Sequence, residues 1–459
     1  SANITEDIPD LNFQGSSTLR VGGDGDYSTI QSAIDDAKNG DTIILARGIY
    51  RENVVITQGI NFQGGWSKDF SSRSFDNALT VIDGQQLSSV ISIQINSGAD
   101  NNIKIECLTI TNGKADYGGG INYFVGGEKT SSVFTLQDCT ISDNESFIDG
   151  GGIWASVTGT GSIEKIYLFD SSIYSNRSRE GGGIAAMAVG DGYLLINADN
   201  NTISSNIASE FAAGIWLNSN GTCSKMEADF SDNEISFNSG PSLDGGAMAA
   251  YASDADANTT VYLNNNTIIN NSAGYGGGLF FYSWGAHSCI DITLKQNIIA
   301  MNKALNSFGG VGFYSAGNAI GNLQMENNTI TENSAGDASG GVLIVAGGGG
   351  HQEIPTETDC SVVTVSSVND IIWGNVPAGK TCDISLHSYL SNAPISMQAS
   401  FSLIGEISNF QSNYSVDNVR NFDPKFDTLG NRLYYLQVDS PAIDAGSPEE
   451  KYYDHSIPP

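Results

Sequence analysis

The stretch NNTIINNSAGYGGGLFFYS, residues 265–283, decides the fold, because close versions of it recur along the chain. Each version has an Ile-x-x-Asn segment, a small-residue run rich in glycine and an apolar run, in that order. The last glycine of the small-residue run recurs every 31 or 32 residues, at Gly120, Gly152, Gly183, Gly214, Gly246, Gly278, Gly310 and Gly341. A fixed period of this length indicates a solenoid of stacked coils.

The residue types identify the kind of coil. Units rich in Gly, Asn, Ser and β-branched residues, with alternating runs such as VFTLQD (residues 133–138), exclude a helical solenoid. Three short parallel strands separated by turns fit one repeat, and stacked coils lie about 4.8 Å apart. The asparagines of the Ile-x-x-Asn segments should then align in a ladder along the axis: Asn144, Asn176, Asn206, Asn238, Asn271, Asn302 and Asn333.

A family resemblance extends this interpretation. The GGGI or GGGL runs with their Ile-x-x-Asn segments resemble the repeats of the polymorphic outer-membrane protein family of bacterial surface adhesins, with Ile mostly in place of that family's Phe. The resemblance covers residues 101–345. It implies an all-β fold, a right-handed parallel β-helix of about 31 to 32 residues per coil. The motifs specify architecture rather than activity.

The two ends of the chain do not follow the repeat. TIQSAIDDAKNG (residues 29–40) predicts a short amphipathic helix, and it resembles the cap of secreted pectate lyase and pectin esterase β-helices. The later catalytic motifs of the esterase group are absent, which disfavours that activity. Residues 422–449 resemble the closing segment of secreted bacterial β-helices, which implies packing over the last coils. We divide the chain into an extension (1–19), cap and first coils (20–100), regular repeats (101–345) and an irregular end with the closing segment (346–459).

The net charge of the chain limits the kinds of partner that it can bind. The chain of 459 residues has 20 Lys and Arg against 51 Asp and Glu, a net charge of −31, which repels nucleic acid and anionic lipid. No run of about 18 apolar residues predicts a membrane span. No basic and apolar leader opens the chain, and its start is compatible with a mature N-terminus after cleavage. The last residues suggest that the chain is part of a longer protein. We expect an extracellular or outer cell-surface location.

A row of aromatic residues is the candidate ligand-binding site. Side chains alternate across the strand that follows each glycine marker, so the second and fourth positions should point outward. These positions place five aromatic residues on one outer face: Trp154, Trp216, Phe280, Tyr282 and Tyr314. Trp154 and Trp216 lie two coils apart, or roughly 10 Å. An exposed row of this kind suits stacking on sugar rings or a protein partner, unless a loop between coils, such as VGGEKTSS or SDADANTT, covers it.

The sequence gives only weak indications of a catalytic or metal-binding site. Asp116, Asp149 and Asp244 all precede a glycine marker, but two of them differ by one residue in their distance from it. Arg177 and Arg179 are the one basic spot, and the four histidines are scattered. Asp254, Asp256 and Asn258 alternate as calcium ligands do, without the glycine and distal glutamate of a helix-loop-helix calcium site. We favour a polar loop tip as the explanation of these residues, so calcium stays a possible rather than a required cofactor.

Six cysteines, an even number without a zinc-binding spacing, favour disulfides in an oxidising compartment. Cys107 and Cys139 lie one coil apart, Cys360 and Cys382 could staple the irregular end, and Cys223 and Cys289 lie about two coils apart.

These observations favour a non-catalytic, adhesin-like or glycan-binding surface protein, whose partner is a polysaccharide or a cell-surface molecule. A polysaccharide lyase or glycoside hydrolase is the first alternative, and a structural surface or filament component is the second.

Overall fold

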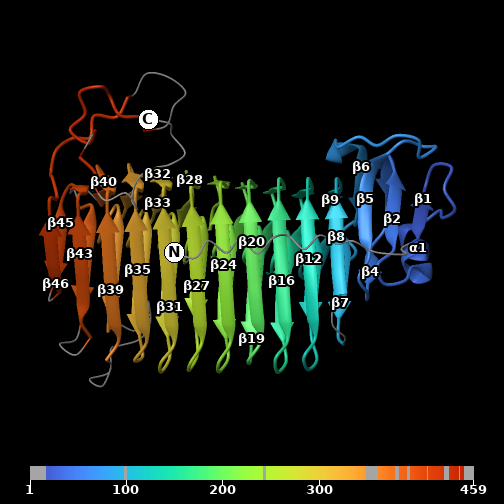
Figure 1. The fold of residues 1–459 in the computed structure, drawn as a ribbon, viewed down its shortest axis with the longest axis horizontal. Helices are drawn as coiled ribbons and strands as arrows, with labels where there is room; N and C mark the ends of the chain where they lie inside the picture. The colour runs from blue at the N-terminus through green and yellow to red at the C-terminus, as the bar shows by residue number, and fades with distance from the viewer. Residues whose placement is uncertain are drawn as a thin grey trace.

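The computed structural model describes residues 17–97, 101–240, 244–347, 360–377, 382–389, 393–410, 412–427, 434–443 and 445–448. Over these residues the chain winds into a parallel β-solenoid of about 11 turns, as predicted (Figure 1). Each regular coil contributes one strand to each of three long parallel sheets, which we call A, B and C. A short additional strand, the arch strand, joins sheet B to sheet C in most of the repeats.

Sheet A consists of β1 (Thr18–Val21), β2 (Thr42–Ala46), β5 (Asn61–Trp66), β8 (Asn101–Glu106), β12 (Ser131–Gln137), β16 (Ile163–Phe169), β20 (Tyr193–Asp199), β24 (Lys225–Ser231), β27 (Asn258–Asn264), β31 (Cys289–Lys295), β35 (Ile320–Glu326), β39 (Val362–Val368), β43 (Ile395–Ser400) and β46 (Asn413–Asp417). Sheet B consists of β3 (Gly48–Tyr50), β6 (Thr80–Asp83), β9 (Thr109–Thr111), β13 (Thr140–Ser142), β17 (Ser172–Tyr174), β21 (Thr202–Ser204), β25 (Glu234–Ser236), β28 (Thr267–Ile269), β32 (Ile298–Ala300), β36 (Thr329–Thr331), β40 (Ile371–Trp373) and β44 (Leu403–Ile404).

Sheet C consists of β4 (Val54–Ile56), β7 (Ile91–Ile95), β11 (Ile121–Val125), β15 (Ile153–Thr158), β19 (Ile184–Val189), β23 (Ile215–Asn220), β26 (Met248–Ala252), β30 (Leu279–Trp284), β34 (Val311–Ala316), β38 (Val342–Ala346), β42 (Ile384–Ser388) and β45 (Ile407–Phe410). The arch strands form two short sheets: β10 (Lys114–Tyr117), β14 (Glu145–Asp149), β18 (Arg177–Glu180) and β22 (Ile207–Phe211), then β29 (Ser272–Ala273), β33 (Lys303–Ala304), β37 (Ser334–Ala335) and β41 (Val376–Pro377).

The predicted helix caps the first coil. α1 (Ile30–Asp36) begins after Thr29, whose hydroxyl accepts the amide hydrogen of Ser32. Its apolar face, with Ile30, Ala33 and Ile34, is buried in the same core as the strands behind it. The helix therefore covers the end of the solenoid that would otherwise leave strand edges open. Among the described residues, no helix is long and apolar enough to cross a membrane.

Two amide ladders bind the coils together. In the predicted ladder, the side-chain amide of each asparagine from Asn144 to Asn302 donates to the amide oxygen of the next one, over 3.0 or 3.1 Å. The ladder continues from Asn333 through Asn375 to the carboxylate of Asp383. A second ladder lies between sheets A and B, formed by Asn201, Asn233, Asn266, Asn297 and Asn328, and it ends on Asp370.

The Asp, Asn or Gln that stands three residues before each Ile of the Ile-x-x-Asn segments also recurs in every repeat, but it does not form the second ladder. The residues three before each Ile have left-handed backbones, with φ between 49° and 58°: Asp138, Asp170, Asn200, Asp232, Asn265, Gln296 and Asn327. Asp and Asn tolerate this conformation better than most residues, which explains their recurrence at a tight turn. From Asn201 onward, the second ladder is formed by the residue that directly follows each of these left-handed positions.

One coil is longer than the glycine markers indicate. Ile215 pairs with Met248 and Met248 pairs with Leu279 in sheet C, so Met248 takes the inward position that the sequence spacing assigned to Ala247. The extra residue lies between the Asn238 rung and Met248. Every side chain of β26 is consequently shifted by one place relative to the expected alternation.

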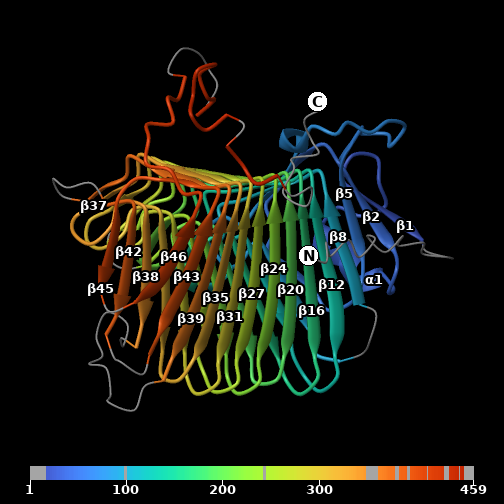
Figure 2. The same ribbon diagram turned by 60° about the vertical axis from the view of Figure 1, so that its left-hand side comes forward.

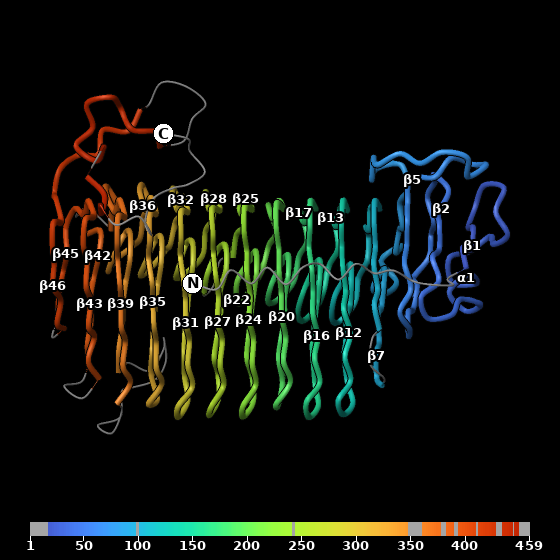
Figure 3. The backbone as a smooth tube through the Cα atoms, in the orientation of Figure 1, coloured from blue at the N-terminus to red at the C-terminus, as the bar shows by residue number. Residues whose placement is uncertain are grey.

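The closing segment lies along the side of the last coils. The backbone amide of Ser447 donates to Asn369, which precedes β40, and the hydroxyl of Tyr434 donates to Glu332, which follows β36. In Figure 2 this part of the chain rises from the upper edge of the solenoid and does not cover the face formed by β45 and β46. The smooth tube in Figure 3 shows the same separation between the closing segment and the regular coils.

Replacing Asn238 with Ala should destabilise the fold strongly. Asn238 accepts from the backbone and side-chain amides of Asn206 and donates to Asn271 and to the Ile203 carbonyl. Its loss leaves buried donors and acceptors unpaired, at a cost of about 1 to 3 kcal/mol each. A lowered urea midpoint would agree with this. Asn322→Ala, which removes an amide on the outer face of sheet A that bonds Asp291, should change the midpoint little.

Glu164 predicts a pH-dependent stability. Its side chain is buried inside the coil, and neither carboxylate oxygen has a hydrogen-bond partner. Burial raises the pKa of Glu164 well above its ordinary value of 4.5, so the folded state holds a proton that the unfolded state releases as pH rises. Its contribution to stability is complete below about pH 4.5 and is lost above it.

Glu164→Gln should therefore reduce the fall in the urea midpoint between pH 5 and pH 8, since the amide does not titrate. Glu128→Gln changes an exposed side chain and should follow the unmodified protein. Equal pH dependence of the Glu164→Gln variant and the unmodified protein would contradict the assignment.

Candidate functional site

The predicted aromatic row points outward from sheet C but is largely buried. Trp154, Trp216 and Phe280 share one column of the sheet register and are 7%, 5% and 1% exposed. The expected exposure of these three side chains is therefore wrong. The cover is not the loop between sheets C and A that the sequence suggested. It comes from the arches, because Tyr117 lies against Trp154 and Phe308 lies against Phe280.

The two tryptophans also lie closer than expected. Their ring centroids are 6.5 Å apart and the ring planes differ by 18°, although two coils separate the backbones. Ala185 occupies the column between them, so its small side chain leaves space for the rings to stack on each other. Stacking and burial make Trp154 and Trp216 part of an outer apolar cluster rather than a platform open to a ligand.

A second column of the same face is more open. Tyr251, Tyr282 and Tyr314 stand in register on successive coils, with ring centroids 6.3 and 6.5 Å apart. Tyr251 is buried, whereas Tyr282 and Tyr314 are partly exposed. The sequence alignment missed Tyr251 because the extra residue in its coil placed it in an inward position. The sequence did contain one signal for Tyr251, namely a tyrosine at a position where the other repeats have small residues.

The arches bring acidic side chains over this face. One arch column runs through Tyr117, Asp149, Glu180, Phe211, Asp244 and Tyr275 on successive coils. Asp149, Glu180 and Asp244 are 5%, 9% and 5% exposed. Phe211 of this column contacts the ring of Tyr251, and the Tyr251 hydroxyl donates to Asp244 over 2.9 Å. We call Asp149, Glu180, Asp244, Trp154, Trp216 and Tyr251 the corner site, since they lie where the arches meet sheet C.

The carboxyl groups of the corner site have altered acidities. Burial raises the pKa of Asp149 to about 6, against the opposing effect of Arg179. Burial and the nearby Asp149 raise the pKa of Glu180 to about 7. The Arg179 guanidinium lies 3.0 Å from Glu180 and 3.6 Å from Glu210, while Oδ1 of Asp149 is buried and has no hydrogen-bond partner. These two carboxyls are therefore poised to exchange protons near neutral pH.

Sequence spacing located this site only in part. Asp149 and Asp244 were candidates, and the register puts both in the same arch column once the longer coil is counted. Asp116 lies beside that column and is exposed. Glu180 was missed, although it stands three residues before its glycine marker, as Asp149 does.

The three calcium candidates lie in and beside one turn. Asp254 and Asp256 lie in the turn before β27, where the Asp254 carbonyl accepts from Ala257 and Asp256 lies 3.5 Å from His287. Asn258 opens the strand and accepts from Thr260. Over the described part of the chain, no group of three or more His, Cys, Asp or Glu side chains is placed to hold a metal ion.

The predicted disulfides do not form between the six cysteines, all of which lie within the described residues: Cys107, Cys139, Cys223, Cys289, Cys360 and Cys382. The register explains each failed pair. Cys107 occupies the left-handed turn position that Asp138 takes in the next coil, so Cys139 is one place out of line. Cys289 stands in the column of Asn258 and Lys225, whereas Cys223 lies in the turn before that column. Cys360 and Cys382 contact opposite ends of the sheet C strands, at Asn318 and Gly340.

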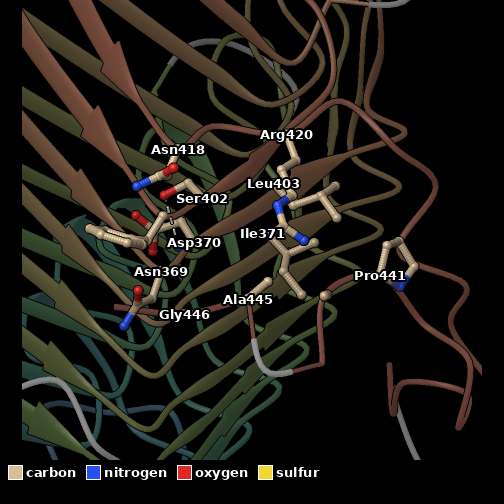
Figure 4. Close-up of a pocket in the computed structure, with 12 residues that line it drawn as sticks. Asn369, Asp370, Ile371, Ser402, Leu403, Asn418, Arg420, Pro441, Ala445 and Gly446 are labelled. Carbon is tan, nitrogen blue, oxygen red and sulfur yellow. Dashed lines mark hydrogen bonds between the residues drawn. The ribbon is translucent and has the colours of Figure 1, made fainter. Parts of the chain in front are cut away.

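A small cavity of about 80 Å³ separates the closing segment from the last coils (Figure 4). Two of its polar groups, Asp370 and Asn369, already have partners. Asp370 accepts from Asn328 and Ser367, and Asn369 accepts from Ser447. The cavity therefore marks the packing of the closing segment and is not our candidate site.

The match to a family model agrees with the architecture. The family model described as a right-handed beta helix region matches residues 169–354, so the chain contains a right-handed β-helix region. The structure of pectate lyase Pel9A is similar with a TM-score of 0.39 and 13% identity, over 97% of this chain and 96% of that chain. The catalytic domain of a GH87 alpha-1,3-glucanase in complex with tetrasaccharides gives a TM-score of 0.36 and 11% identity, over 88% and 68%. No curated protein matches the sequence.

Replacing Trp216 with Ala should lower stability rather than only remove a binding contact. Trp216 packs against Trp154 and Tyr251 and is 5% exposed, and such a truncation costs about 3 to 5 kcal/mol. Urea unfolding measures the effect. Trp284→Ala, at a side chain that is 43% exposed, is the matched control and should have a much smaller effect. An unchanged midpoint for the Trp216 variant would show that the arches do not seal this face in solution.

Proposed function

We propose that this protein is an extracellular or cell-surface binding protein that holds a polysaccharide along the outer face of sheet C. The observation that carries the proposal is the tyrosine column, in which Tyr282 and Tyr314 are partly exposed and pack against buried aromatic rings. Tyrosine offers a flat apolar face and a hydroxyl at its edge, as sugar rings do. Successive coils repeat this contact at about the strand spacing of 4.8 Å.

Neighbouring groups extend the surface. Tyr389, which is 52% exposed, lies near the same end of sheet C, and its ring contacts that of His387. His387 and Val345 continue the column in which Tyr314 stands. Burial raises the pKa of Tyr314 well above its ordinary value, so its phenol stays neutral and can donate a hydrogen bond. The adhesin-like repeats favour a role at the cell surface.

The alternative of an enzyme that acts on polysaccharides draws support from the corner carboxyls. A lyase acting on uronates is less favoured, because its charge-neutralising cation would have to come from Arg179, which is already paired with Glu180 and Glu210. A purely structural role would leave the tyrosine column without a purpose.

Replacing Tyr282 and Tyr314 together with Ala should weaken binding of the recognised polysaccharide by about tenfold or more, since each partly buried aromatic contact contributes roughly 1 kcal/mol. Affinity electrophoresis against neutral and acidic polysaccharides measures this. Tyr174→Ala removes a tyrosine that is 38% exposed on sheet B and serves as the control. If the double variant binds as tightly as the unmodified protein, the proposed binding surface is wrong.

A further inference from the structure

Asp149 and Glu180 form the closest acidic pair of the arch column. They are direct register partners on β14 and β18. Asp149 is 5% exposed, the Glu180 side chain is 12% exposed, and Oδ1 of Asp149 has no hydrogen-bond partner although it is shielded from solvent. A buried carboxylate oxygen without a partner costs free energy, and such groups persist where a ligand or a reaction uses them.

We propose that Asp149 and Glu180 are an acid–base pair that hydrolyses a glycosidic bond of a neutral polysaccharide. The proposal rests on the proposed function, because the sugar chain held against sheet C must reach the corner site. The pair stands in the arch column between Tyr117, whose ring lies against Trp154, and Phe211, whose ring lies against Tyr251. Glu180 is near enough to Tyr251 to influence its phenol. The corner site thus supplies two carboxyls, which are the groups that glycoside hydrolysis needs.

Charge identifies the class of substrate. The corner holds Asp149, Glu180 and Asp244, with Glu210 beside them, and Arg179 is the cation paired with two of these groups. The chain as a whole carries −31. A polyuronate would be repelled from this site, whereas a neutral polysaccharide presents only hydroxyl groups to the carboxylates.

The spacing of the pair indicates the course of the reaction. Asp149 and Glu180 stand on adjacent strands, which lie about 4.8 Å apart, and glycosidases that retain the anomeric configuration hold their two carboxyls roughly 5 Å apart. Asp149, whose Oδ1 has no hydrogen bond, is the nucleophile. Glu180, held by Arg179 through Oε1, is the acid and later the base.

The acidities of the two groups support these roles. With a pKa of about 6 for Asp149 and about 7 for Glu180, the pair holds one proton between these values. Arg179 opposes the rise in both pKa values, and Glu210 adds to it. Asp244 faces the same corner and is hydrogen-bonded to Tyr251.

The proposed reaction has two balanced steps. Asp149 attacks the anomeric carbon while Glu180 gives its proton to the glycosidic oxygen, so that bond breaks and the first sugar leaves with a new hydroxyl. Glu180 then takes a proton from water as the water oxygen displaces Asp149 from the anomeric carbon. One water is consumed, one new reducing end forms, and both carboxyls return to their starting states.

Access to the pair passes the ion pair between Arg179 and Glu210. Their side chains are 43% and 47% exposed and meet over 3.6 Å. An exposed ion pair of this kind contributes about 1 kcal/mol or less and opens readily.

The test measures release of reducing ends and binding in parallel, with the full chain and a panel of neutral polysaccharides and aryl glycosides. Asp149→Asn should lower release about a hundredfold or more while binding persists. Glu180→Gln should lose release from polysaccharides but keep activity on aryl glycosides whose leaving group needs no proton. The rate for the unmodified protein should be highest between about pH 6 and pH 7, with retention of configuration.

Asp143→Asn and Glu128→Gln change exposed acids outside the site and should leave release unchanged. Binding without release by the unmodified protein overturns the acid–base pair and leaves the proposed function standing. Release that survives Asp149→Asn overturns the assigned roles. Neither binding nor release across the panel overturns both proposals.

Discussion

The buried asparagine amides of one coil must find their partners on the next coil, and the rest of the structure depends on this constraint. Asparagine meets the demand because its amide both donates and accepts. At each full rung the oxygen takes two hydrogen bonds from the preceding asparagine, and the amide nitrogen donates forward and to a carbonyl of an earlier coil, as at Asn238. The ladders therefore have a direction along the axis.

That direction explains how the ladders end. The last group has donors arriving from behind and no need to donate forward, and a carboxylate is an acceptor only. Asp370 and Asp383 occupy these two terminal positions. Burial raises the pKa of Asp370 to about 7 in spite of these hydrogen bonds, so the end of this ladder titrates near neutral pH.

The same register that builds the core also builds the surface. Each outward position repeats once per coil, so a functional surface arises when the residues of one column differ from coil to coil. The arch column changes from Tyr117 through Asp149 and Glu180 to Phe211 while its backbone position stays constant. Aromatic and acidic side chains are thereby brought together without any departure from the repeat.

The sequence by itself determined the coil, the parallel solenoid, the capping helix and the asparagine ladder, because these follow from local periodicity and from residue types that stacked backbones demand. It also determined which side chains of most coils point outward. Only the tertiary structure decided which outward groups are covered, since the arches that bury Trp154 and Trp216 come from a different part of each coil. The extra residue before Met248 and the offset of Cys139 likewise needed the actual register, because a shift of one place in a strand reverses the direction of a side chain.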